Sequence, residues 1–309
     1  MNTPTAFFIT FTSIVIIFYS STVFANNLLA KSPLDKSTTD LISSNNNGEA
    51  ICYSPLYHNV SYQEVLELTF QPPKQTFSYG PAPAQFAELR IPNQPAPPSG
   101  HPLVIFIHGG CWLNAYSVDH TSAFSSALAS TGYAVVSLEY RRIGDDGGGW
   151  PGSYEDVLSG IKSVLELEQS TYNSNNVAIV GHSAGGHLAL LAGAALKQIP
   201  SIKSVIGLAA ITDLPSYAKG NNSCQQATPQ FMGGKPEDKP EAYGQANPTE
   251  ADLHPQSRLI QGTADTIVGL NQTLDEVTVH RIEGAGHFDM IHPYTNSFQT
   301  LLKQLAADL

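Results

Sequence analysis

Basic residues are scarce in this chain of 309 residues. It has 15 Lys and Arg against 26 Asp and Glu, which gives a formal net charge of −11 at pH 7, and no long run of Lys or Arg offsets it. Nucleic acids and anionic membrane surfaces attract clustered positive charge, so this composition argues against both as partners. Charged residues are only 13% and apolar residues 42%, which is typical of a globular chain and excludes a disordered or coiled-coil one.

Cysteine is scarce as well, with Cys52, Cys111 and Cys224 as the three examples. In an oxidising compartment three cysteines allow one disulfide and leave one thiol. We place Cys111 in a loop at the active site, so the expected pair is Cys52–Cys224. The alternative is three unpaired cysteines.

No Lys or Arg precedes the first apolar run, from Phe7 to Phe18. The small-x-small pattern Val23-Phe24-Ala25 follows it, and residues 1–25 are therefore interpreted as a signal peptide of a secreted or periplasmic protein. The alternative is an uncleaved N-terminal anchor, which is the one case in which we expect a membrane partner. Residues 26–60, rich in Asn, Ser and Thr at their start, are expected to be a flexible leader.

Strand and helix patterns alternate over residues 61–309. Continuous apolar runs at 103–107 and 177–180 are typical of strands covered on both faces, and 154–168 has helical spacing. This alternation predicts an α/β domain with a mainly parallel, doubly wound sheet. The prolines within 76–92 favour edge strands there.

Two later stretches depart from the alternation. Residues 213–256 are rich in Pro, Gly, Asn and Gln and have no strong period, which predicts a small cap over the sheet, with a plain surface loop as the alternative. Residues 290–309 are predicted to form a closing helix that contains His292.

A candidate nucleophile follows the strand at 177–180. Gly181-His182-Ser183-Ala184-Gly185 is a G-x-S-x-G pattern, and a small-residue helix is predicted from Ala184 to Leu196. A sharp strand-to-helix turn of this kind exposes the serine hydroxyl at the top of the sheet. Glycines at 181 and 185 let strand and helix cross closely.

A serine hydroxyl needs a base, and the base needs an orienting carboxylate. Asp265 and His287 each follow a predicted strand and a glycine-containing turn, in the order Ser, acid, His. We assign Asp265 as acid and His287 as base, with Asp213 as the alternative acid. His280 and His292 are interpreted as structural.

An acyl-transfer site also needs donors for an oxyanion. His108-Gly109-Gly110-Cys111-Trp112 directly follows the strand at 103–107, so the predicted donors are the N–H of Ala184 and that of Gly109 or Gly110. His108 is interpreted as a residue that packs the loop. Trp112 is a candidate substrate-binding residue, with core packing as the alternative.

Other polar residues near these motifs receive no catalytic role. His187 lies one helical turn after the nucleophile and is assigned to packing. A set of charged residues is interpreted as surface charge, with a buried ion network as the alternative: Glu139, Arg141, Arg142, Glu155 and Asp156.

Together these four motifs resemble the α/β-hydrolase superfamily, and within it the esterase group that includes hormone-sensitive-lipase-like carboxylesterases and kynurenine formamidases. The resemblance covers residues 76–308. It implies an α/β-hydrolase fold, a Ser183–Asp265–His287 triad, an oxyanion hole at Gly109, Gly110 and Ala184, and no need for a cofactor or a metal.

The expected function is that of a serine hydrolase acting on small carboxylic esters. An aryl formamidase or amidase with the same triad is the second hypothesis, and a non-catalytic binding protein on this fold is the third. The sequence leaves open the acyl and alcohol specificity and the oligomeric state.

Overall fold

The computed structural model describes residues 1, 43–44, 50–51, 57–167 and 171–309. The predicted signal peptide, apart from its first residue, and Cys52 lie outside the described residues. The chain divides into two compact units, Met1–Tyr53 and Ser54–Leu309. In the first, β1 (Ser43–Ser44) pairs antiparallel with β2 (Ala50–Ile51). Among the residues described, no helix has the length and apolar composition to cross a membrane.

The second unit is built on an eight-stranded sheet in the order β10-β9-β8-β7-β5-β6-β4-β3. The six strands from β10 to β6 run parallel, while β4 pairs antiparallel with both β6 and β3. The strands are β3 (Gln75–Ser78), β4 (Phe86–Arg90), β5 (His101–Ile107), β6 (Ala134–Leu138), β7 (Tyr172–His182), β8 (Ile202–Leu208), β9 (Ser257–Gly262) and β10 (Thr278–Ile282).

Helices cover both faces of this sheet. One apolar cluster joins the sheet to α3 and α4, and another joins its opposite face to α1, α2 and α8. Short 3-10 helices complete the chain: η1 (Val118–Thr121), η2 (Pro248–Glu250), η3 (Leu270–Gln272) and η4 (Phe288–Ile291). The α-helices are α1 (Tyr62–Leu66), α2 (Ser122–Ser130), α3 (Gly152–Glu166), α4 (Ala184–Ala195), α5 (Leu214–Tyr217), α6 (Ser223–Met232), α7 (Pro240–Gln245) and α8 (Asn296–Asp308). The predicted doubly wound α/β fold is confirmed.

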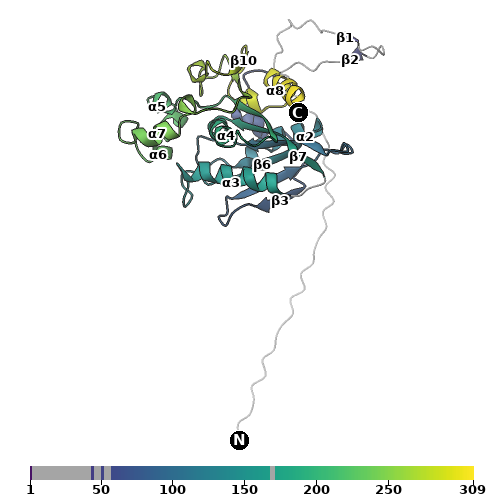
Figure 1. Ribbon diagram of the computed structural model, residues 1–309, viewed down its shortest axis with the longest axis horizontal. Coiled ribbons are helices and arrows are strands. Elements are labelled where there is room, and N and C mark those ends of the chain that lie inside the picture. The colour runs from purple at the N-terminus through teal and green to yellow at the C-terminus, as the bar shows by residue number, and fades with distance from the viewer. Residues whose placement is uncertain (2–42, 45–49, 52–56, 168–170) are drawn as a thin grey trace. The chain divides into compact units, whose positions relative to one another are not determined.

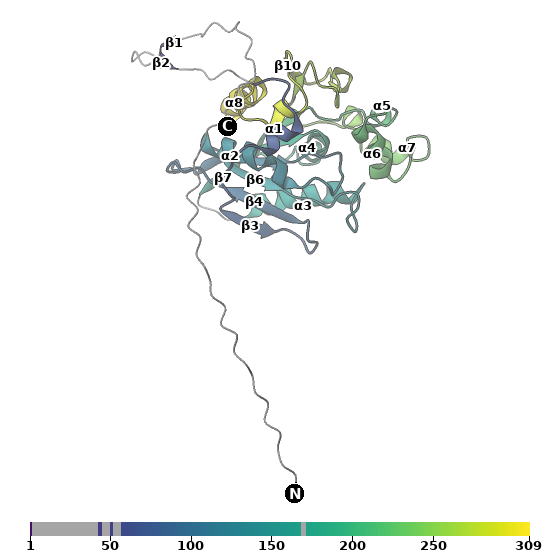
Figure 2. The same ribbon diagram turned by 180° about the vertical axis from the view of Figure 1, so that it is seen from behind.

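The stretch 213–256 contains three short α-helices and the 3-10 helix η2. Asn222 caps α6 through a reciprocal capping box with Gln225, and Gly233 ends it in the left-handed conformation. Helices α5, α6 and α7 gather on one side of the unit, which both views show (Figure 1, Figure 2). Helices of only four to ten residues explain why the sequence has no strong period there.

Three expectations differ from the structure. Of the two strands expected at an edge, β3 lies there and β4 does not, because β4 pairs on both sides. The closing helix begins at Asn296, since Thr295 caps it by accepting the Phe298 N–H, so His292 lies in the preceding turn. Residues 57–60, assigned to the leader, belong to the folded unit, where they are hydrogen-bonded to the C-terminal part of the chain. The Tyr57 N–H, for example, donates to the Tyr294 carbonyl oxygen.

Candidate active site

Ser183 lies at the turn between β7 and α4, where a close crossing forces an uncommon backbone. Its φ is +55°, a left-handed value that is rare outside glycine. A Cβ at Gly181 would lie 2.2 Å from the Gly185 carbonyl oxygen, and one at Gly185 would lie 2.2 Å from that of Ile107. Only glycine fits at these two positions, which explains the motif in steric terms.

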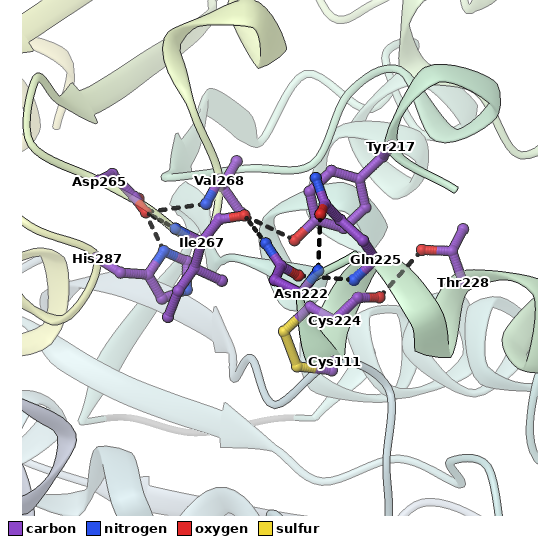
Figure 3. Close-up of a disulfide and its surroundings, with 10 residues drawn as sticks. All are labelled: Cys111, Tyr217, Asn222, Cys224, Gln225, Thr228, Asp265, Ile267, Val268 and His287. Carbon is purple, nitrogen blue, oxygen red and sulfur yellow. Dashed lines mark hydrogen bonds and ion pairs between the residues drawn. A yellow bond between two sulfur atoms is a disulfide. The ribbon is translucent and has the colours of Figure 1, made fainter. Parts of the chain in front are cut away.

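Asp265 and His287 meet at the carboxyl ends of β9 and β10. These strands are parallel neighbours, so the turns after them lie side by side. Nδ1 of His287 lies 2.8 Å from Oδ2 of Asp265, and Oδ1 accepts the N–H groups of Ile267 and Val268, both at 2.8 Å (Figure 3). A carboxylate only accepts, so Nδ1 of His287 carries the proton and Nε2 is left with a free lone pair.

A partly open cavity of about 180 Å³ lies between the candidate nucleophile and the candidate base. Ser183, His287 and Gly110 line it, together with the pair Cys111 and Cys224. The structure therefore brings both residues to one cavity, with Asp265 directly behind His287. Asp213, the alternative acid, instead caps α5 by accepting the Ser216 N–H.

The loop after β5 lies directly against the nucleophile. A Cβ at Gly109 would lie 3.1 Å from Cβ of Ser183 and 2.9 Å from the His182 carbonyl oxygen. The loop backbone at Gly109 therefore lies so close to the nucleophile turn that a side chain there would collide with it. Gly110 has a φ of +108°, and Ala184 is buried as the first residue of α4. This arrangement brings all three expected oxyanion-hole residues next to Ser183.

His108 holds this loop through a buried ion network. Its Nε2 lies 2.8 Å from Oε1 of Glu139 and its Nδ1 lies 2.8 Å from the Gly109 carbonyl oxygen. Both partners are acceptors, so the imidazole ring is held between the Glu139 carboxylate and the backbone of the loop. Burial favours a higher pKa for Glu139, but the His108 and Arg142 charges and the Val118 N–H outweigh it and lower the pKa.

The surface assignment of these charges is therefore wrong for most of them. Glu139 and Asp156 are both 1% exposed, and Arg142 is also buried. Arg141 pairs with Asp156 at 2.7 Å, whereas Glu155 is exposed as expected. The sequence misled because Glu139 is compensated by His108, 31 positions earlier, as well as by the nearby Arg142, and the first of these contacts has no local signal.

Trp112 does not line the cavity, which corrects its assignment as a substrate-binding residue. Its side chain is fully buried and stacks on Phe231 at a centroid distance of 4.6 Å. His187 packs edge-on against Trp112, and its Nε2 donates to the Ala246 carbonyl oxygen at 2.7 Å. Burial lowers the pKa of His187 to about 4, so this residue is a neutral packing group.

The disulfide joins Cys111 to Cys224, so the expected Cys52–Cys224 pair is wrong. The two Cα atoms are 4.8 Å apart although 113 positions separate them in sequence, and Figure 3 shows the bond beside Asn222. The error arose because the cap segment returns over the loop that contains Cys111. The bond therefore ties α6 to the residue that follows Gly110.

Sequence reasoning missed four aromatic residues that line the cavity. They are Tyr62, Tyr116, His120 and Phe288. None belongs to a recognisable motif, and Tyr62 lies in the segment interpreted as the start of the domain. Burial lowers the pKa of His120 to about 4, so its ring presents a neutral surface to the cavity.

Comparison with known proteins places this site in a family. The model of the BD-FAE family matches residues 89–277. Esterase LipC of Mycobacterium tuberculosis is 26% identical over 245 residues, which are 69% of this chain and 59% of that protein. A kynurenine formamidase of Danio rerio is 29% identical over 114 residues, which are 37% of this chain and 36% of that protein.

A plant relative and a solved structure extend this picture. A probable isoprenylcysteine alpha-carbonyl methylesterase of Oryza sativa is 29% identical over 210 residues, 60% of this chain and 49% of that protein. The chain thus spans about half to three-fifths of the length of the first curated relatives it matches. Esterase B of Lactobacillus rhamnosis superposes with a TM-score of 0.64 at 20% identity, over 79% of this chain and 88% of that one, which shows a shared α/β-hydrolase fold.

Proposed function

Because the chain belongs to the BD-FAE family, we propose that it is a serine hydrolase that cleaves small carboxylic esters. The observation that supports this most is the Asp265–His287 hydrogen bond beside the cavity that Ser183 lines. Several relatives are named esterases, including those of Mycobacterium tuberculosis and Lactobacillus rhamnosis. The modest volume of about 180 Å³ favours small substrates.

In the proposed reaction, Oγ of Ser183 attacks the ester carbonyl carbon while Nε2 of His287 takes the hydroxyl proton. Asp265 keeps the Nδ1–H tautomer and stabilises the imidazolium that forms. The N–H groups of Ala184 and of Gly109 or Gly110 receive the developing oxyanion. His287 then protonates the departing alcohol, and a water molecule, activated in the same way, releases the acid and regenerates Ser183.

An N-formyl aryl amide is the second candidate substrate, favoured by the similarity to the Danio rerio kynurenine formamidase. The same steps apply to it, with an arylamine as the leaving group. A non-catalytic binding role would not require the Asp265–His287 pair beside Ser183.

Hydrolysis of p-nitrophenyl acetate and butyrate, compared with N-formylkynurenine, tests these proposals. Ser183→Ala is the diagnostic variant, and Ser223→Ala is a matched control because Ser223 lines the same cavity. We expect ester turnover that Ser183→Ala abolishes and Ser223→Ala retains. Preference for the formyl amide favours the second candidate. A folded wild-type protein that neither turns over substrate nor reacts with a fluorophosphonate probe indicates the binding role.

We also propose that residues 1–25 direct export and are then removed. The Cys111–Cys224 bond supports this, since disulfides persist in oxidising compartments. N-terminal sequencing of the exported protein is expected to find a start after Ala25, whereas an intact N-terminus in a membrane fraction would indicate an anchor.

A further inference from the structure

The N-terminal segment, defined here as residues 57–66, is built into the second unit although it lies outside the region that the family model matches. Tyr57 pairs with Thr295 in a parallel β-bridge, and its N–H donates to the Tyr294 carbonyl at 2.8 Å. Val60 and Val65 are buried in the apolar cluster that contains α2 and α8. The segment is therefore anchored at its start and along its buried side.

Asp289 connects this segment to the turn that carries His287. Its carboxylate accepts three backbone N–H groups: Asn59 at 2.8 Å, Val60 at 2.9 Å and Gly286 at 3.1 Å. Asp289 is 1% exposed, and an ionised carboxylate makes charge-assisted bonds of this kind stronger than neutral ones. One side chain thus fixes both the residue before His287 and a segment about 230 positions earlier.

Tyr62 is the part of the segment that reaches the cavity. Ser61 caps the short helix α1 through a reciprocal bond with Glu64, which sets the direction of the first helical side chain. The half-buried ring of Tyr62 packs against Phe288, with centroids 5.3 Å apart, and edge-on against Tyr116 at 5.9 Å. It lines the same cavity as Ser183 and His287.

We propose that Tyr62 determines substrate size in this cavity, and that Asp289 is the positioning residue that holds Tyr62 and the His287 turn together. This inference rests on the proposed ester hydrolysis. An aromatic ring that closes one wall excludes longer groups, and removal of the ring opens space for them. One methylene in an apolar pocket changes kcat/KM by roughly 10- to 200-fold, so a lost ring has a measurable effect on chain-length preference.

Two substrate series test the proposal: p-nitrophenyl esters from acetate to octanoate, and acetates of alcohols of increasing length. We expect Tyr62→Ala to raise the long-to-short ratio of kcat/KM in one series by about tenfold or more. Tyr62→Phe keeps the ring and is expected to keep the wild-type ratio. An unchanged ratio in both series for Tyr62→Ala overturns the proposal.

Asp289→Asn is expected to shift the same ratio in the same direction and to lower kcat. Because both changes release one wall, the shift in the double variant with Tyr62→Ala should be less than the product of the single shifts. Asp308→Asn is the matched control, since Asp308, at the end of α8, is a mostly buried carboxylate that pairs with Arg258 of β9. If the role of Asp289 is purely structural, Asp289→Asn will lower the thermal unfolding midpoint, as we expect for Asp308→Asn, and leave the long-to-short ratio of kcat/KM unchanged. This outcome refutes the positioning role.

Two comparisons keep the test interpretable. If Asp289→Asn fails to fold, the contrast between Tyr62→Ala and Tyr62→Phe still decides the size-determining role. Absence of Ser183-dependent turnover in the wild-type protein overturns the proposed function itself, whereas an active wild type with an unchanged ratio in Tyr62→Ala overturns only this inference.

Discussion

Replacement of Asp265 by asparagine tests the proposed acid with almost no change in side-chain shape. Oδ1 of Asp265 accepts the N–H groups of Ile267 and Val268, so this position requires an acceptor. The asparagine carbonyl oxygen is expected to occupy it. The amide NH2 group then takes the place of Oδ2, which lies 2.8 Å from Nδ1 of His287.

An NH2 group only donates, so Nδ1 of His287 must become the acceptor and the ring proton moves to Nε2. Nε2 then has no lone pair to take the proton from Ser183. The wrong tautomer in a Ser-His-Asp triad lowers kcat by about 10⁴-fold, and we expect a loss of this size for Asp265→Asn. This corresponds to about 5 kcal/mol of lost transition-state stabilisation.

The assay is steady-state hydrolysis of p-nitrophenyl butyrate by wild type, Asp265→Asn and Asp213→Asn, with thermal unfolding midpoints as a control for folding. Asp213 is the matched control because it was the alternative acid in the sequence and caps α5 in the structure. We expect Asp213→Asn to keep near-normal kcat. Activity of Asp265→Asn within about tenfold of wild type, or a large loss confined to Asp213→Asn, refutes the tautomer argument.

Three further predictions concern the surroundings of the site. Glu139→Gln is expected to lower kcat by about 10- to 100-fold with little change in KM, because it removes the carboxylate charge that holds the His108 ring and, through it, the Gly109 loop. The matched variant of the exposed Glu155, Glu155→Gln, should change neither kcat nor KM. Paired Cys111→Ser and Cys224→Ser substitutions should lower the free energy of unfolding in urea by about 2–4 kcal/mol, and an unchanged midpoint would contradict this. The unfolded state protonates His187 near pH 6.5 and the folded state only near pH 4, so its stabilising contribution is present above pH 6.5 and is lost as pH falls towards 4. Between pH 7 and 4.5, the free energy of unfolding should therefore fall by about 2 kcal/mol more in wild type than in His187→Gln, and equal losses would exclude His187 as the cause.

Local patterns in the sequence were sufficient to predict the central strands of the sheet and to predict that the candidate residues follow the ends of strands. The apolar runs at 103–107 and 177–180 became central strands, because a strand buried on both faces leaves a continuous signal. Ser183, Asp265 and His287 each follow a strand, and parallel strands bring their carboxyl ends to one edge. Their catalytic roles stay predictions.

The failures at the site mostly involve partners that the chain brings together from a distance. The pair Cys111–Cys224 depends on the path of the cap, and the burial of Glu139 depends on its contact with His108. Tyr62 reaches the cavity from a segment that Asp289, about 230 positions later, binds. No local pattern encodes such contacts, since each partner looks ordinary in its own neighbourhood.

The cap is attached on both sides of the cavity, and this limits how a substrate enters. The hydroxyl of Tyr217 and Nδ2 of Asn222 both donate to the Ile267 carbonyl oxygen, next to Asp265, while Cys224 is bonded to the opposite loop (Figure 3). Outward rotation of the cap as a hinged door would break a covalent bond or pull apart the acid loop. We therefore expect substrate and product to pass without rotation of the cap. In the proposed reaction, a wall tied in this way is expected to keep its shape from one substrate to the next, so the reacting groups would need no reassembly between turnovers.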